Sequence, residues 1–378
     1  MRAGAGLFFA QSQMSTQAIK SAKVRLRTGL RGICMKAALL LMFSAIAASP
    51  LLGFAQEPGD YEAKITVCGD KREFLYHLPP CYDGCRKLPV VFVFHGKSAS
   101  AKLVKKFSEM DETADKFGFI TVYPNGTGFS LFKGFNAGGS TNPKDLEKPD
   151  DVAFTNAILN YLERNLCVDC DRVYATGLSN GAMMCHRLAV EMPHRIAAIA
   201  PISGMIGTHV CPPKCAMPIM QFQGSCDEVL PMDGPVESGL FASQTFYPTA
   251  QTMQFYACAA GCKATPTITD LPDCYDDDTS IRIHTYTDCK PGIEVILIEI
   301  CGGGHQWPQH GLPFKYLGAT TEEINANEMM WCFFQKHTLS ERGCNCGCGA
   351  VATTASKEKA TQGPVTARIT DTETPMPR

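Results

Sequence analysis

The sequence predicts an α/β fold in which a mostly parallel β-sheet carries helices on both of its faces. Short runs of β-branched and aromatic residues alternate with longer amphipathic stretches, and strands separated by helices normally pair in parallel. Some runs are apolar throughout, such as Val-Val-Phe-Val-Phe at 90–94, which indicates burial on both sides of the sheet. With 378 residues, of which 45% are hydrophobic, the chain is long enough to enclose one large core.

The expected strands are short and bounded by turn residues: Val90–Phe94, Phe119–Tyr123, Val173–Thr176, Ala197–Ile202, Pro218–Phe222 and Val295–Glu299. The expected helices lie between or after them, at about Lys102–Lys116, Val152–Arg164, Gly181–Glu191 and Thr320–His337. Together these elements predict a single domain at 56–340. Within it, Pro235–Lys290 is less regular and holds four cysteines, so we expect an insertion there that disulfides hold in place.

Residues 1–55 have the pattern of a secretory signal peptide. Basic residues precede an apolar run that starts after Lys36 and ends in small residues, which predict cleavage near Ala55–Gln56. A start at Met35 gives a signal of ordinary length, so residues 1–34 are a possible N-terminal extension. An uncleaved membrane anchor is the weaker alternative, because the run is barely long enough to span a bilayer. The mature chain is therefore expected to be secreted.

Nineteen cysteines are far more than a cytosolic enzyme of this length usually carries. One of them, Cys34, precedes the apolar run, so cleavage leaves eighteen, an even number that suits a set of disulfides of unknown connectivity. Cys167–Cys170 and Cys344–Cys348 have the spacing of metal ligands, but neither motif has a second half, and no metal site is expected. Residues 341–378 are expected to form a cysteine-containing, disordered tail rich in Thr, Ala, Lys and Pro.

The formal net charge of −2 gives no electrostatic footprint for nucleic acid, because phosphate binding needs a clustered basic excess. Nor does the sequence contain a long basic stripe of the kind that faces a membrane surface. We therefore expect no nucleic-acid partner, and no stable membrane partner once the signal is removed.

A serine flanked by glycines lies where a strand is expected to end and a helix to begin. The motif is Gly177-Leu178-Ser179-Asn180-Gly181. A sharp turn at such a junction lifts the serine hydroxyl out of the sheet, and the free N–H groups of the following helix favour negative charge nearby. The motif alone is weak evidence, but its place between strand and helix favours Ser179 as a nucleophile over a structural turn.

A serine nucleophile needs a base and an acid that orients the base, and in sheets of this kind they follow in the chain order Ser, acid, His. Asp227 follows the fifth expected strand and His305 follows the sixth. We therefore expect Asp227 to hold the imidazole tautomer and His305 to take the proton from Ser179. Glu228 is the rival acid, and an ordinary loop aspartate or a buried histidine is the plainer alternative.

Two backbone N–H groups must face the oxyanion that forms during acyl transfer. One is expected from Asn180, directly after the nucleophile, and the other from Lys97, in the loop that follows the first expected strand. His95 opens this loop and is expected to support it, since as a rival base it stands in the wrong chain order. His186 and His194 are interpreted as packing or surface residues.

Taken together, these motifs resemble the secreted esterases that group feruloyl esterases with polyhydroxybutyrate depolymerases of the LpqC kind. The resemblance covers the chain from about residue 68 to residue 337, and its specific stretches are Leu78–Pro80, Val91–Gly96, Gly118–Gly126, Asp150–Phe154, Arg172–Gly204 and Gly302–Pro308. It implies an α/β-hydrolase fold, no organic or metal cofactor, and the three catalytic roles given above. It also implies a disulfide between Cys262 and Cys289 on the lid side.

The chain departs from the family pattern at three places. It has Gln223-Gly-Ser where relatives often have His-Gly-Thr, Lys97-Ser-Ala where they are richer in glycine, and Phe135-Asn-Ala-Gly where many have Trp-Asn-Ala-Gly. These positions border the acyl or alcohol pocket, so they bear on the expected substrate more than on the reaction class.

The resemblance implies a secreted serine carboxylic-ester hydrolase of the feruloyl-esterase kind, which releases hydroxycinnamic acids from plant cell-wall polysaccharide, as in xylan degradation, through an acyl-enzyme. The alternative is a polyhydroxybutyrate or other polyhydroxyalkanoate depolymerase, so the expected substrate is an ester linked to polysaccharide or a polyester. An inactive carbohydrate-binding or surface interaction protein is the alternative from another class. Trp307 and Phe135 are candidate substrate-binding walls for a phenolic acid, although such residues more often pack in a core.

Overall fold

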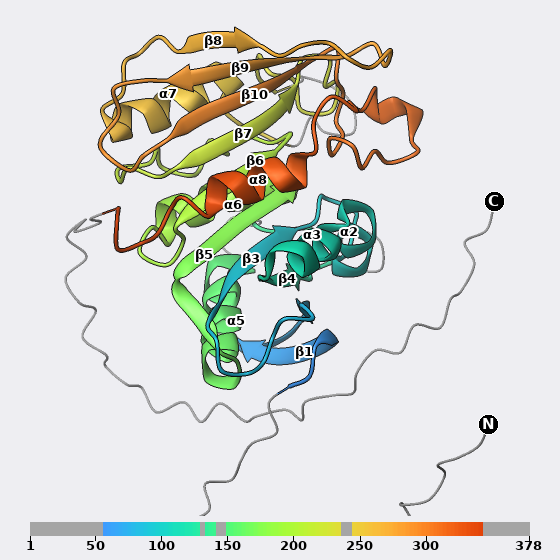
Figure 1. The fold of residues 1–378 in the computed structure, drawn as a ribbon, viewed down its shortest axis with the longest axis vertical. Coiled ribbons are helices and arrows are strands. Elements are labelled where there is room, and N and C mark those ends of the chain that lie inside the picture. Colours follow the sequence, from blue (N-terminus) through green and yellow to red (C-terminus); the bar gives the residue numbers. More distant parts are fainter. Residues whose placement is uncertain (1–55, 129–132, 141–148, 236–243, 343–378) are drawn as a thin grey trace, which may run out of the picture. The chain divides into compact units, whose positions relative to one another are not determined.

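The computed structural model describes residues 56–128, 133–140, 149–235 and 244–342. Their central element is a ten-stranded sheet in the order β1-β2-β4-β3-β5-β6-β7-β10-β9-β8 (Figure 1). Its strands are β1 (Gly59–Val67), β2 (Asp70–Leu78), β3 (Leu88–Phe94), β4 (Ile120–Pro124), β5 (Val168–Leu178), β6 (Ala198–Ile202), β7 (Ile219–Gly224), β8 (Thr267–Asp270), β9 (Ser280–Tyr286) and β10 (Val295–Cys301). The predicted signal peptide lies outside the described residues, as does the predicted tail beyond residue 342.

The middle of the sheet is parallel, which confirms the predicted fold class. β4, β3, β5, β6, β7 and β10 run in the same direction, and each coincides with one of the six expected strands. Antiparallel strands extend the sheet on both sides. The β1–β2 hairpin pairs with β4 at one edge, and β9 followed by β8 pairs with β10 at the other. None of these four strands was expected.

Helices cover both faces because successive side chains of each strand point into two different cores. Val90, Phe92 and Phe94 of β3 belong to one core, and Val91 and Val93 to the other. The first core is covered by α5 (Asp151–Asn165), α6 (Asn180–Glu191) and α7 (Thr249–Ala260), and the second by α2 (Ala101–Ser108), α3 (Met110–Phe117) and α8 (Ala326–Phe334). No helix within the described ranges is long and apolar enough to cross a bilayer.

Two expected helices have different bounds. The stretch predicted as one helix at 102–116 forms α2 and α3, because Glu109 between them adopts a left-handed conformation with φ 49°. The helix expected at 320–337 begins only at Ala326, where the side chain of Asn325 caps it by accepting a backbone hydrogen bond. A short 3-10 turn, η1 (Lys315–Leu317), precedes it.

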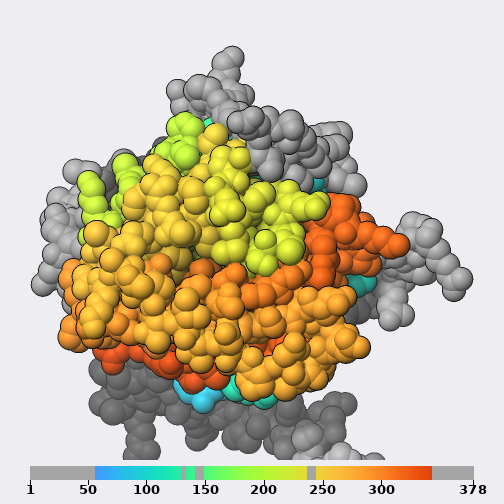
Figure 2. Space-filling model, turned by 90° about the horizontal axis from the view of Figure 1, so that it is seen from above, coloured from blue at the N-terminus to red at the C-terminus, as the bar shows by residue number. Residues whose placement is uncertain are grey.

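The stretch at 235–290 is more regular than its sequence indicates, since α7, β8 and β9 lie within it. Figure 2 views the molecule from this side and shows the yellow and orange residues, from α7 to β10, forming much of the surface. All four residues of β8 are exposed. Burial therefore imposes no alternation of polar and apolar residues on this strand, and its sequence does not reveal it.

Within the described ranges, the cysteines are less cross-linked than expected. Cys262 and Cys289 form the disulfide that the family resemblance implies, and Cys215 is also disulfide-bonded. Cys185 shows why an even count is a poor guide, because it is fully buried in α6 and its thiol faces the carbonyl of Gly181 rather than another cysteine. The cysteines of the described residues that are thiols are Cys68, Cys81, Cys85, Cys167, Cys170, Cys185, Cys211, Cys226, Cys258, Cys274, Cys301 and Cys332.

Candidate active site

Ser179, Asp227 and His305 follow strands whose carboxyl ends share one edge of the sheet. They come directly or shortly after β5, β7 and β10, and in strand order only β6 separates β5 from β7. The carboxyl ends of parallel strands meet at one edge, where loops rather than paired backbone present side chains to a ligand. The chain order of the three residues thus corresponds to neighbouring strand ends.

Ser179 carries the strain of a sharp turn between β5 and α6. Its backbone has φ 62° and ψ −121°, a conformation that costs a non-glycine residue about 1–3 kcal/mol. A Cβ atom on Gly177 would lie 2.6 Å from the carbonyl oxygen of Phe94 in β3, and one on Gly181 would lie closer still. The glycines therefore let the turn approach β3, while the serine itself adopts the unusual backbone conformation.

His305 is paired with Asp227. Its Nδ1 lies 2.8 Å from Asp227 Oδ2, and both side chains are buried. The other carboxylate oxygen accepts the backbone N–H groups of Val229 and Leu230 at 2.9 and 2.8 Å. Because an ionised carboxylate only accepts, Nδ1 carries the proton and Nε2 is left as the basic nitrogen. The rival Glu228 is exposed.

Gln223, which the family comparison in the sequence placed at the border of the substrate pocket, contacts Asp227. It lies in β7, fully buried, and its Nε2 donates to Asp227 Oδ2 at 3.2 Å and to the carbonyl of Leu230 at 3.1 Å. This glutamine stands where relatives often carry histidine, and it holds the Asp227 carboxylate from the strand side. The available signal was a polar residue within an apolar strand, since a buried amide needs hydrogen-bond partners.

The loop that carries His305 is fixed by close backbone contacts. Gly302 has φ 79°, which glycine adopts without strain. The N–H groups of Gly304 and His305 donate to the carbonyls of Ala319 and Leu317 at 2.8 and 2.6 Å. The glycines before the histidine therefore allow it to be tied to the segment that follows η1.

His95 supports the loop after β3, as predicted. Its Nδ1 donates to the carbonyl of Gly96 at 2.7 Å, and its Nε2 accepts the N–H of Gly126 at 2.9 Å. Burial disfavours the charged imidazole and, with a smaller contribution from Lys133, lowers the pKa of His95 to about 4. The ring is thus neutral with both nitrogens engaged. Gly96 itself lies against the nucleophile, since a Cβ atom on it would be 3.3 Å from the Cβ of Ser179.

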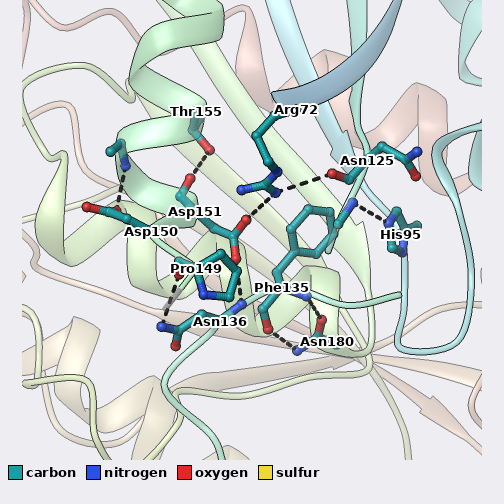
Figure 3. A network of polar contacts seen from close by, with 12 residues as sticks. Arg72, His95, Asn125, Phe135, Asn136, Pro149, Asp150, Asp151, Thr155 and Asn180 are labelled. Carbon is teal, nitrogen blue, oxygen red and sulfur yellow. Dashed lines mark hydrogen bonds and ion pairs between the residues drawn. The ribbon is translucent and has the colours of Figure 1, made fainter. Parts of the chain in front are cut away.

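The two predicted oxyanion donors directly follow residues at the nucleophile turn. Asn180 begins α6, and Lys97 follows the glycine that packs against the serine. Within the described ranges, neither backbone N–H donates to another residue of the protein. The side chain of Asn180 is fixed by a two-point contact with the backbone of Phe135, whose N–H donates to Oδ1 at 2.7 Å and whose carbonyl accepts from Nδ2 at 3.0 Å (Figure 3).

Trp307 does not form the pocket wall expected of it. The side chain is fully buried, its indole N–H donates to Asn327 Oδ1 at 2.9 Å, and its ring packs edge-on against Phe107. It therefore has no surface to offer a substrate. Phe135 is also largely buried, 6% exposed, but its ring lies beside the site, with its centroid 4.6 Å from that of the His95 ring.

His186 and His194 are packing and surface residues, as the sequence predicted. His186 is fully buried in α6, where it bonds to Tyr256 Oη at 2.9 Å and to Gln221 Oε1 at 3.1 Å, and burial lowers its pKa to about 4. His194 is exposed.

One group of side chains has the composition of a metal site: Asp60, His77 and Asp111. It joins β1, β2 and α3, and no other such group of three occurs in the part of the chain that the structure describes. The ammonium of Lys105 lies 3.0 Å from Asp60 and also pairs with Asp111. The protein itself supplies the positive charge that a metal would bring, so we interpret the group as a structural ion-pair network.

Comparison with known proteins gives one family and several relatives. Residues 73–245 match the family model described as "Esterase PHB depolymerase". A protein of Nocardia uniformis subsp. tsuyamanensis described as "Putative esterase NocK" is 30% identical over 280 residues, which cover 69% of this chain and 78% of the relative. Feruloyl esterase B of Piromyces equi is 25% identical over 240 residues, covering 62% of this chain and 42% of the relative. The chain thus spans less than half of that enzyme.

Among solved structures, an acetyl xylan esterase from Aspergillus awamori aligns with a TM-score of 0.48 and 16% sequence identity, covering 73% of this chain and 99% of that one. A structure described as sOPH aligns with a TM-score of 0.42 and 17% identity, covering 56% of this chain and 78% of that one.

Proposed function

Since the chain belongs to the esterase family that groups polyhydroxybutyrate depolymerases with feruloyl esterases, and is a carboxylesterase of the α/β-hydrolase fold, we propose a specific activity for it. It is a secreted serine esterase that releases hydroxycinnamic acids from plant cell-wall polysaccharide. The observation that carries the serine mechanism is the buried pair of Asp227 and His305 at the edge of the sheet where the strained Ser179 turn also lies. That arrangement supports the assignment of Ser179 as nucleophile, His305 as base and Asp227 as orienting acid.

In the proposed mechanism Ser179 Oγ attacks the ester carbonyl while His305 Nε2 takes its proton. Asp227 keeps the imidazole in the required tautomer and stabilises it when it becomes charged. The N–H groups of Lys97 and Asn180 stabilise the oxyanion, and their lack of another acceptor in the described part of the chain supports this role. His305 then protonates the departing alcohol and activates the water that hydrolyses the acyl-enzyme.

The assignment to feruloyl esters draws on the relatives, because feruloyl esterases from several fungi match this chain. The description of the family model, a polyhydroxybutyrate depolymerase, supports the second candidate, a polyester such as an oligomer of hydroxybutyrate. Secretion is supported by the signal pattern at 36–55 and by the disulfide between Cys262 and Cys289, since disulfides persist in oxidising compartments.

The reaction class is tested with Ser179→Ala on a p-nitrophenyl ester of a short-chain acid. We expect wild type to release p-nitrophenol and the variant to lose about 10³-fold or more in kcat. Ser203→Ala is the matched control, because Ser203 also follows a parallel strand with a positive φ, of 48°, but lies outside the proposed mechanism. Wild-type activity in Ser179→Ala contradicts the serine mechanism.

The substrate class is tested by comparing methyl ferulate with a hydroxybutyrate oligomer at equal concentrations of wild-type enzyme. The feruloyl proposal expects the larger kcat/KM for methyl ferulate, measured as released ferulic acid. A larger kcat/KM for the hydroxybutyrate oligomer contradicts the feruloyl proposal and supports a polyhydroxyalkanoate depolymerase.

A further inference from the structure

The segment 133–136 connects the two loops that flank the nucleophile. The carbonyl of Lys133 accepts the N–H of Ser98, at 2.8 Å, in the loop that contains the proposed Lys97 donor. Two residues further on, the backbone of Phe135 pairs with the Asn180 side chain at 2.7 and 3.0 Å. One short segment therefore contacts both the loop that contains Lys97 and the side chain of Asn180, the two residues of the proposed oxyanion hole.

A buried carboxylate anchors this segment. The N–H of Asn136 donates to Asp151 Oδ2 at 2.7 Å, and the other oxygen of Asp151 pairs with Arg72 Nη2 at 2.6 Å (Figure 3). The Asp151 side chain is fully buried and that of Arg72 is 5% exposed. Arg72 comes from β2 and Asp151 from the first turn of α5, so two distant elements converge on one backbone N–H.

Arg72 also reaches the loop on the other side of the site. Its Nη2 donates to the carbonyl of Asn125 at 3.3 Å, and the next residue, Gly126, donates its N–H to His95. His95 in turn holds Gly96, which packs against the nucleophile. The Arg72–Asp151 pair is thus linked to one half of the hole through residues 125 and 126 and to the other through residues 135 and 136.

Stability alone is a weak reason for such a pair, because the desolvation of two buried charges commonly cancels their attraction. We propose that Asp151, held by Arg72, is a positioning residue for the oxyanion hole: it fixes segment 133–136 and with it the separation of the Lys97 and Asn180 N–H groups. This inference rests on the proposed serine mechanism and adds to it two residues that do not contact the substrate.

The expected effect is a loss of transition-state stabilisation with little change in substrate binding. Removing one oxyanion donor costs about 10²–10³ in kcat, so a donor that is displaced rather than removed is expected to cost about 10- to 100-fold. KM for the p-nitrophenyl ester is expected to stay within about twofold. Phenylboronic acid, which forms a tetrahedral adduct with a serine hydroxyl, is expected to bind more weakly by the same factor as the loss in kcat.

The test compares two double variants that both remove the buried charges. Arg72→Met with Asp151→Asn keeps a carbonyl oxygen that can accept the Asn136 N–H, whereas Arg72→Met with Asp151→Leu, of similar size, offers none. The inference expects the Leu form to lose kcat and boronate affinity about 10- to 100-fold relative to wild type. The Asn form gives up the Arg72 contacts but keeps the acceptor for the Asn136 N–H, so it is expected to lose both at least threefold less than the Leu form. Equal values of kcat and boronate affinity in the two forms overturn it.

Two further variants separate positioning from folding. Tyr174→Phe removes a buried hydrogen bond to the carbonyl of His337, outside this network, and is expected to lower the melting temperature without changing kcat. Arg72→Lys keeps a charge beside Asp151 while giving up the planar fork of arginine. Arg72→Lys is used if a double variant does not fold. A lowered kcat at constant KM in Arg72→Lys supports the inference, whereas unchanged kcat and boronate affinity overturn it.

Failure of the inference is distinguishable from failure of the mechanism through Ser179→Ala. If that variant is inactive while the Leu form has wild-type kcat, only the positioning role is wrong. If Ser179→Ala remains active, the serine mechanism itself is wrong, and the positioning role with it.

Discussion

Three of the eight non-glycine residues with a positive φ in the described chain lie at neighbouring strand ends around the proposed site. Ser98, Ser179 and Ser203 have φ of 61°, 62° and 48°, and they lie just beyond β3, β5 and β6, which are neighbours in the sheet. Such conformations persist only where the surroundings enforce them, and they concentrate at functional sites. Strain at three adjacent strand ends therefore agrees with the placing of catalysis at this edge of the sheet.

At the same scale, Asp227→Asn is expected to lower kcat about 10³- to 10⁴-fold. An amide at this position can donate to Nδ1 and so favour the tautomer that protonates Nε2, the nitrogen that must accept the proton from Ser179. The measurement is kcat on a p-nitrophenyl ester. Glu228→Gln is the matched control, because Glu228 is adjacent but exposed, and it is expected to retain wild-type kcat. The reverse pattern identifies Glu228 as the orienting acid.

Sequence reasoning reached the residues whose role depends on chain order and missed those whose role depends on a distant partner. The acid and base were selected because each follows a strand. Gln223 was noted only as a departure near the substrate pocket, and Arg72 and Asp151 were given no role, although Asp151 lies in the family-like stretch Asp150–Phe154. Arg72 and Asp151 are 79 positions apart, and nothing local in either stretch shows that the two charges meet.

At the scale of elements, a network of charges holds the β1–β2 hairpin against two helices. His77 of β2 lies 2.6 Å from Asp60 of β1 and 2.7 Å from Asp115 of α3, and Lys105 of α2 bonds to Asp60. Burial opposes a charged imidazole, but hydrogen bonds to Asp60 and Asp115 and the charge of Asp111 outweigh it and raise the pKa of His77 to about 9. The hairpin is therefore held by a protonated histidine near neutral pH.

This network predicts a loss of stability in alkaline solution. Because the pKa of His77 is higher in the folded state than its ordinary value of 6.5, its contribution is complete below about pH 6.5 and is lost as the pH rises through about 9. We expect roughly 1–2 kcal/mol, since one partner is partly exposed. Urea unfolding at pH 6 and pH 9.5 measures the difference, which is expected to shrink in His77→Gln. An equal difference in this variant contradicts the assignment.

The elements that the sequence predicted are those buried on both faces. The six parallel strands are apolar runs with turns at their ends, and each was located to within a few residues. Of the four strands at the edges, β1, β8 and β9 were missed because few of their residues are buried, and none in β8. β2 is largely buried, but it opens with the charged run Asp70–Glu73, which hides the apolar pattern. The break between α2 and α3 at Glu109 was missed because a left-handed residue there has no glycine to mark it.

At the scale of the whole molecule, one covalent link spans the region that the sequence failed to describe. The disulfide between Cys262 and Cys289 joins the end of α7 to the turn after β9, across 27 positions of sequence. It fastens the helix on one face of the sheet to the strands at its edge, far along the chain from the Ser179 turn. Its contribution is therefore expected in stability rather than in catalysis.

Replacing both Cys262 and Cys289 with serine is expected to lower the free energy of unfolding by about 3.5 kcal/mol, as loop-closure entropy for a link of this length indicates. Guanidinium unfolding under oxidising conditions measures the change, and kcat at 25 °C is expected to remain within about twofold of wild type. Cys258→Ser, which changes an exposed thiol on the same helix, is the control and is expected to leave stability unchanged. Equal stability of the double variant and wild type contradicts this role.

The position of β10 links the timing of synthesis to the onset of activity. It is the last strand of the described chain to leave the ribosome, yet it lies between β7 and β9, and it leads directly into the His305 loop. Until it is made, the β8–β9 hairpin has no neighbour in the sheet and the backbone of β7 is unpaired along one side. A chain terminated before β10 therefore lacks the proposed base and exposes unpaired strand edges, which makes it prone to aggregate.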